Sequence, residues 1–416
     1  MDGNQIKEYI SEKVLMKIIK GLFIALIFFF PYSMSLRNIL LGLLFIFYLI
    51  AKTINFKIEK TQLNKYIMLF FIFSILSFFN SNNLKLSLET LISPIFKYIA
   101  FYFMALDLIS NLNLNKYFNT LFYGNLGLLL SGLLVEYYTK IDVFYRDNDM
   151  GTLTAIIFIF FISLFFIKED KLYKKIMVFL GIIGVIIAFV LTYSRGATLA
   201  LLGSFVVWVI LVFWKRFRNK LNKKILFGSI VIVLIIILIS TPFILPDRLI
   251  NRFQRMKNID SSWSLKLRVY MWESSLWMIK NNPLVGVGLG NFRSNFLYYI
   301  DEVKQTNIPK SARGHIKPHN LYLHIALEQG VISLILFLIM GYKVIKKGLV
   351  DFWYSQKGSL KEIISLSLIG GIISVAIHSF VDTTFLYGNV GLYIILLFVF
   401  SLKLDKNLLS NDEMGG

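Results

Sequence analysis

Long apolar stretches recur along almost the whole chain and are separated by short polar segments. A hydrophobic stretch of about 20 residues is long enough to cross a bilayer as an α-helix. We predict twelve transmembrane helices, at residues 14–30, 36–51, 65–79, 94–110, 117–138, 151–167, 174–192, 197–214, 225–245, 318–342, 361–380 and 385–404. The pattern therefore predicts an all-α polytopic membrane protein.

One long polar interruption divides the chain into three parts. Residues 1–245 carry predicted helices one to nine, residues 246–317 form an extracytoplasmic segment, and residues 318–416 carry helices ten to twelve and a cytoplasmic tail. Within the middle segment the apolar spacing predicts a helix over 262–281, which Asn281-Asn282-Pro283 ends. The alternating glycines of Gly286–Gly290 predict a tight turn after it. The extracytoplasmic segment is thus expected to be mainly helical.

The composition agrees with a membrane protein. Of the 416 residues 56% are hydrophobic, and 39 are Phe. The chain has no cysteine, which excludes disulfides, thiol catalysis and thiolate metal sites.

The positions of Lys and Arg predict the orientation in the membrane. With the N-terminus in the cytoplasm, most of the 44 Lys and Arg residues fall on the cytoplasmic side, for example Lys52, Lys57, Lys60 and Lys65 in one loop. Both termini are then cytoplasmic. The net charge of +20 therefore indicates topology and contact with anionic membrane lipids, and we expect no nucleic-acid partner.

Several cations fall on the outer side in this topology. Arg195 lies in the six-residue turn 192–197, and Arg268 lies in the extracytoplasmic helix. Arg146 and Lys97 also fall near the outer face. Guanidinium groups bind phosphate in a bidentate manner, so these residues together could bind a lipid-linked diphosphate. The alternative for Arg195 is an arginine at a helix end whose charge reaches the membrane surface.

Polar residues open predicted helix ten. His319 lies at its outer end and can titrate near neutral pH, whereas Asn320 shares a helix face with His324 and Glu328. His324 and Glu328 could equally form a structural hydrogen-bonded pair inside the bundle.

A metal site is not expected at this helix. His319 and His324 are five residues apart, so their side chains diverge by about 140° around a helix. We therefore predict no metal ligands and no cofactor.

Two acidic features complete the outer face. Asp382 follows predicted helix eleven, where it could orient a base or an acceptor or be an ordinary loop carboxylate. The triplet Asp147-Asn148-Asp149 could bind a divalent ion or lie in a solvated loop.

Four stretches together resemble the O-antigen ligase and O-antigen polymerase superfamily of bacterial envelope glycosyltransferases. They are Arg146–Gly151, Tyr193–Ala197, Arg268–Trp272 running into Asn282–Phe292, and His319-Asn320. In the ligase pattern His-Asn is followed after nine residues by Gly, here Gly330. Ser333 stands where that pattern has Gly, Thr or Tyr, and the Asp147–Asp149 region departs from the family's usual Asn-Pro-Asn-like string.

The resemblance implies a GT-C-like fold of about 12 transmembrane helices and a metal-independent, inverting transfer of glycan from undecaprenyl diphosphate to a hydroxyl acceptor. The acceptor is the lipid A core in a ligase and a carrier-linked repeat unit in a polymerase. Carried over to this sequence, Arg195 and Arg268 would hold the diphosphate, and His319 would act as general base or as a further diphosphate contact. Arg146, Lys97, Asn320 and Asp382 are additional candidates for substrate binding.

The predicted location is the bacterial inner membrane, with the active site on the periplasmic or outer face. A different class remains open, because a transporter or flippase for lipid-linked sugars could use the same cationic groove without chemistry. Such a protein would distribute its charges through mid-membrane depth and carry broken helices in paired halves.

Overall fold

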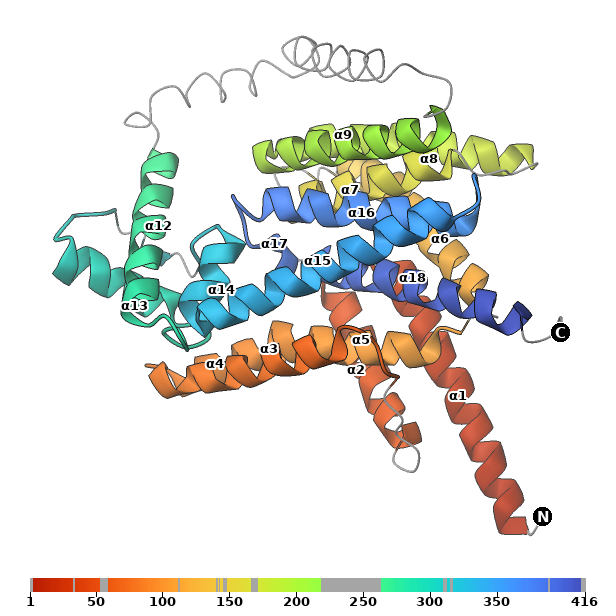
Figure 1. Ribbon diagram of the computed structural model, residues 1–416, viewed down its shortest axis with the longest axis horizontal. Coiled ribbons are helices and arrows are strands. Elements are labelled where there is room, and N and C mark those ends of the chain that lie inside the picture. The colour runs from red at the N-terminus through yellow and green to blue at the C-terminus, as the bar shows by residue number, and fades with distance from the viewer. Residues whose placement is uncertain are drawn as a thin grey trace.

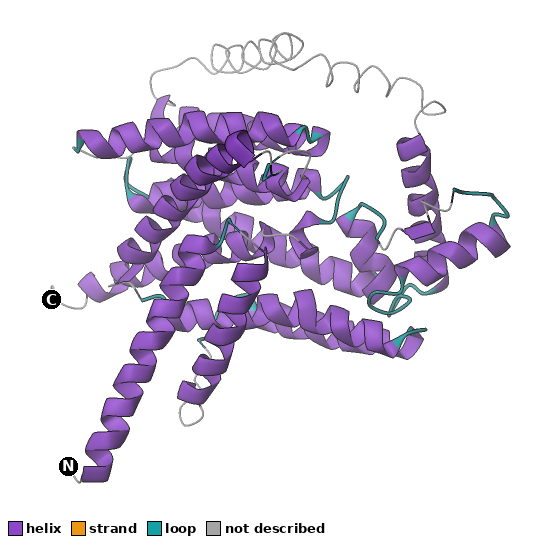
Figure 2. Ribbon diagram, turned by 180° about the vertical axis from the view of Figure 1, so that it is seen from behind, coloured by secondary structure: helices purple, strands orange, loops and turns teal. Residues whose placement is uncertain are grey.

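The computed structural model describes the chain except residues 1–2, 33, 53–58, 111–112, 140, 142, 145–147, 166–170, 218–262, 310–312, 315–316, 388–389 and 413–416. Every regular element in the described residues is a helix, and none is a strand (Figure 2). The all-α prediction is therefore confirmed for these residues. Predicted span 225–245 lies outside them.

The first half of the chain contributes nine α-helices to the described structure. They are α1 (Gly3–Phe29), α2 (Met34–Lys52), α3 (Asn64–Leu76), α4 (Leu84–Thr90), α5 (Lys97–Leu108), α6 (Leu114–Thr139), α7 (Asn148–Leu164), α8 (Leu172–Thr192) and α9 (Arg195–Phe217). The second half contributes α12 (Trp263–Asn281), α13 (Phe292–Tyr298), α14 (Leu321–Gln329), α15 (Val331–Tyr354), α16 (Leu360–His378), α17 (Thr384–Tyr387) and α18 (Val390–Asp412).

Five stretches in the described part of the chain are helical, long and apolar enough to cross a membrane. They are Leu84–Leu108, Leu114–Thr139, Leu172–Thr192, Arg195–Arg216 and Leu360–His378. Four shorter apolar helices accompany them, at Ser35–Ala51, Asn64–Asn80, Asn148–Leu164 and Val390–Leu404. The prediction of twelve transmembrane helices is therefore not confirmed as a count.

The packing separates a buried interior from exposed apolar faces. Helix α7 is almost completely buried and contacts α8, α9 and α16. By contrast, α2 exposes Ile39, Ile46 and Ile50, each by more than half of its side-chain surface. Exposed apolar faces on helices are typical of contact with lipid. The bundle thus has α7 in its interior and apolar side chains on its outer surface, as expected of a membrane protein.

Predicted span ten, residues 318–342, is not one helix. Helix α14 ends at Gln329 and α15 begins at Val331, because Gly330 adopts φ +86° and ψ +164°. This backbone conformation is essentially restricted to glycine and interrupts the helical hydrogen bonds. Helix α14 is only nine residues long, too short to cross a bilayer.

Three helices gather at one end of the bundle. Helices α12, α13 and α14 lie together at the left of Figure 1, with α12 running across the direction of α9, α15 and α16. Helix α12 contacts both α13 and α14. We call this region the α12–α14 end.

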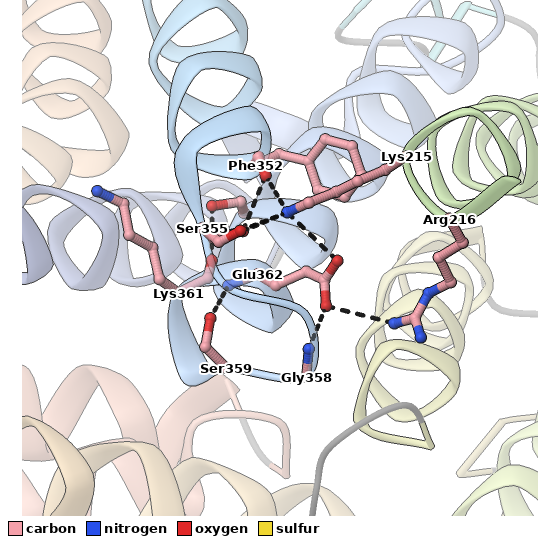
Figure 3. Close-up of polar contacts among 9 residues, drawn as sticks. Lys215, Arg216, Phe352, Ser355, Gly358, Ser359, Lys361 and Glu362 are labelled. Atoms are coloured by element: carbon pink, nitrogen blue, oxygen red, sulfur yellow. Dashed lines mark hydrogen bonds and ion pairs between the residues drawn. The ribbon is translucent and has the colours of Figure 1, made fainter. Parts of the chain in front are cut away.

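A polar cluster fixes α9, α15 and α16 elsewhere in the bundle (Figure 3). Lys215, in the last turn of α9, donates to the backbone oxygen of Phe352 and, at 2.8 Å, to that of Ser355. Its ammonium also lies 3.4 Å from the carboxylate of Glu362, which Arg216 contacts at 3.3 Å. The Glu362 side chain is almost completely buried, so the charges of Lys215 and Arg216 compensate a carboxylate that would otherwise be costly to bury.

Candidate active site

Asp382 is the centre of the candidate site. It lies between α16 and α17, is 5% exposed, and its carboxylate accepts hydrogen bonds from three partners. Oδ1 lies 2.7 Å from the backbone nitrogen of Thr383 and 3.4 Å from Nδ1 of His319, and Oδ2 lies 2.9 Å from Nδ2 of Asn148. These donors keep the buried carboxylate ionised. Burial alone would raise the pKa of Asp382, but the hydrogen bond and charge of His319 and the Thr383 N–H outweigh it and hold that pKa below its usual range.

His319 is held in position by its backbone. Its φ is +50°, a left-handed conformation that is uncommon for residues other than glycine and costs about 1–3 kcal/mol. The next residues are bound to the end of α16, since Leu321 N donates to Ser379 O at 2.8 Å and the Asn320 amide donates to Phe380 O at 3.1 Å. The backbone next to His319 is thus hydrogen-bonded to the end of α16, and the His319 side chain lies beside Asp382. Because Asp382 can only accept, Nδ1 of His319 is the donor, and the basic lone pair of the ring then belongs to Nε2.

Helix α12 brings Arg268 to the same place. Trp272, one turn after Arg268, donates its indole N–H to the backbone oxygen of Pro318 at 3.1 Å, directly before His319. Arg268 is half-buried and its charge interacts with that of Asp382. Burial lowers the pKa of Arg268 and the Asp382 carboxylate opposes that shift. An arginine does not lose its charge under these conditions, so Arg268 supplies a fixed cation.

Arg195 lies at the junction of α8 and α9, close to the turn that carries Asp382. Tyr193 ends α8 in a left-handed conformation, with φ +48°, and Arg195 is the first residue of α9. A Cβ placed on Gly196 would lie 2.8 Å from Nε2 of His378 and 2.6 Å from Val381. The absence of a side chain at Gly196 therefore lets the start of α9 approach the turn that carries Asp382.

The other predicted site residues have separate environments. Lys97 is the first residue of α5, and its positive charge is repelled by that of Arg37. The Asn320 amide caps α14 by accepting from Leu323 N at 3.0 Å. Arg146 lies outside the described residues. The predicted contacts of Lys97, Asn320 and Arg146 with substrate stay predictions.

His324 and Glu328 form a buried pair on α14. Nε2 of His324 lies 3.6 Å from Oε2 of Glu328, and both side chains are almost completely buried. The same Glu328 oxygen accepts from Gly290 N at 2.9 Å. Through Glu328, this pair links α14 to the glycine turn after α12 and helps to hold these two segments together.

Comparison with known proteins gives this arrangement a context. Residues 180–338, less than half of the chain, match the family described as O-antigen ligase. This stretch includes Arg195, Arg268 and His319. The chain resembles the O-antigen ligase and polymerase superfamily.

A relative from Haemophilus influenzae, described as an uncharacterised protein, is 28% identical over 184 residues. The alignment covers 42% of this chain and 44% of the relative, so the chain spans less than half of that protein's length. The family match is therefore the comparison that bears on function, and it shows that residues 180–338 are similar to O-antigen ligases.

Two side chains of the site, those of Asn148 and Ser194, were not predicted individually from the sequence. Asn148 belongs to the triplet that could bind a divalent ion, and Ser194 belongs to the motif Tyr193–Ala197. Both lie at helix junctions, and their hydrogen bonds cross between distant segments. The one available signal was that each stands next to charged residues at a predicted outer face.

Proposed function

We propose that the chain is a membrane glycosyltransferase of the O-antigen ligase type. It transfers a glycan from undecaprenyl diphosphate to a hydroxyl acceptor such as a lipid A core sugar, without a metal ion and with inversion at the anomeric carbon. The reaction takes place on the periplasmic or outer face of the inner membrane, and both termini are cytoplasmic. One observation supports this most strongly: the His319–Asp382 pair lies where the segments carrying Arg268 and Arg195 meet.

The proposed step follows from these groups. The acceptor oxygen attacks the anomeric carbon while the bond from that carbon to the diphosphate oxygen breaks. The acceptor proton passes to Nε2 of His319, and Asp382 stabilises the resulting imidazolium through Nδ1. Negative charge develops on the departing undecaprenyl diphosphate, where Arg195 and Arg268 stabilise it.

The test uses purified protein in detergent with an undecaprenyl-diphosphate-linked glycan and an acceptor. We expect the parent to release undecaprenyl diphosphate and to extend the acceptor. Arg268→Ala and His319→Ala should each lower the rate about 100-fold or more, because each removes a group that acts in the transition state.

The matched control is Arg293→Ala. Arg293 is exposed on α13 in the same segment and donates to Arg313 O, so its loss should leave transfer at the parent rate. A parent that releases no carrier, or an Arg268→Ala variant as fast as the parent, would contradict the proposal. Supplying lipid A core or carrier-linked repeats as acceptor then separates a ligase from a polymerase.

A further inference from the structure

The first residue of α7 links two parts of the candidate site. Asn148 lies between Asp382 on one side and Ser194, the residue before Arg195, on the other. We propose that Asn148 is a positioning residue for glycan transfer: its amide holds the Asp382 carboxylate toward His319 and ties it to the turn that carries Arg195. This inference rests on the proposed function.

The direction of the hydrogen bonds fixes the amide. Ser194 Oγ donates to Oδ1 of Asn148 at 2.8 Å, and Nδ2 of Asn148 donates to Oδ2 of Asp382 at 2.9 Å. The reverse orientation would set the amide oxygen against a carboxylate oxygen, which can only accept. Each donor in the series of hydrogen bonds through Ser194, Asn148, Asp382 and His319 therefore has an acceptor: Ser194 donates to Asn148, and both Asn148 and His319 donate to Asp382.

The geometry makes His319 sensitive to this support. Its contact with Asp382 is 3.4 Å, near the upper limit for a hydrogen bond, so a small rotation of the carboxylate would break it. Thr383 N binds the same oxygen as His319, whereas Asn148 binds the other oxygen. Asn148 thus sets the rotation of the carboxylate plane.

Asn148 itself is exposed, so the fold does not depend on packing its side chain. Its neighbour one turn later, Thr152, instead contacts Nδ1 of His378 at 2.8 Å within the core. The central amide of the triplet Asp147-Asn148-Asp149 thus has hydrogen-bond partners within the protein, whereas Asp147 lies outside the described residues.

Ionisable groups of the described residues that act on Asp382 include His319 before α14, His378 at the end of α16 and Arg268 on α12. All three act on Asp382 in the parent and in any variant of residue 148. A ratio of variant rate to parent rate at each pH therefore isolates the change made at residue 148.

The test is Asn148→Asp, which keeps the size of the side chain and replaces the donor by a carboxylate facing Asp382. We expect transfer at neutral pH to fall at least about 10-fold, because a good hydrogen bond becomes a repulsion between like charges. At acidic pH one proton shared by the two carboxyl groups restores a donor, so the ratio to the parent should rise. Asn148→Ala should lose rate without this acid recovery.

The matched control is Asn119→Asp, at an exposed asparagine on α6, which should keep the parent rate at every pH. Parent-like transfer by Asn148→Asp at neutral pH would overturn the inference, as would an equal loss at all pH values. If the parent shows no transfer, the proposed function fails. The inference is then judged by thermal denaturation, in which Asn148→Asp should be destabilised at neutral pH and recover on acidification, and a pH-independent Tm difference would reject it.

Discussion

At the scale of single residues, Gly196 sets how closely α9 approaches the turn before Asp382. It is helical, so alanine suits its backbone, but a Cβ there would lie 2.6–2.8 Å from atoms of Val381 and His378. We expect Gly196→Ala to push Arg195 away from the site and lower transfer about 10-fold or more, since misplacement by about 1 Å can cost 100-fold. Steady-state rates measure this.

Gly42→Ala is the control for that substitution. Gly42 lies within α2, and a Cβ on it would meet nothing within 4 Å. Transfer by Gly42→Ala should equal that of the parent. Equal activity of the Gly196→Ala variant would show that the close approach of α9 does not matter for the reaction.

At the scale of elements, Gly330 separates α14 from α15 and so determines where His319 is held. A Cβ there would collide with the backbone of Leu284, and its φ and ψ are unfavourable for other residues by about 1–3 kcal/mol. We expect Gly330→Ala to lower Tm in detergent and to reduce transfer, because Leu284 and Val285 would have to move away from the junction of α14 and α15.

Gly341→Ala provides the comparison within the same long stretch. Gly341 lies in the middle of α15 with open space around its Cβ position, so alanine should preserve or slightly raise Tm. An unchanged Tm for Gly330→Ala would mean that α14 and α15 can join into one helix without cost.

At the scale of the whole molecule, the topology can be tested directly because the chain has no cysteine. Lys280 is exposed at the end of α12, and Lys357 is exposed between α15 and α16. With a membrane-impermeant thiol reagent, Lys280→Cys should be labelled in intact spheroplasts, and Lys357→Cys only after permeabilisation. Labelling in the opposite order would invert the proposed orientation and remove the site from the outer face.

The sequence predicted local features better than long-range contacts. The helix predicted at 262–281 is α12, because its apolar spacing and Asn-Pro ending act within the segment itself. The glycine turn is confirmed too, with positive φ at Gly286, Gly288 and Gly290. The break at Gly330 was not predicted, since apolar residues continue on both sides of it. The partners of Asn148 lie 46 and 234 residues away, and no local pattern selects them.

The polar cluster of Figure 3 has a consequence for motion. Helices α9 and α16 touch near Gly196 and His378, and Lys215, 20 residues along α9, binds Glu362 in the first turn of α16. The interface between α9 and α16 therefore has a close backbone approach at one end and an ion pair at the other. Alternating access works by rocking one half of a transporter against the other. These two contacts would oppose such a movement if its boundary ran between α9 and α16. Contacts at both ends of the α9–α16 interface are therefore expected to limit the movement of these two helices relative to each other. A fixed helix pair suits an enzyme whose substrates diffuse in the membrane to a site that does not move.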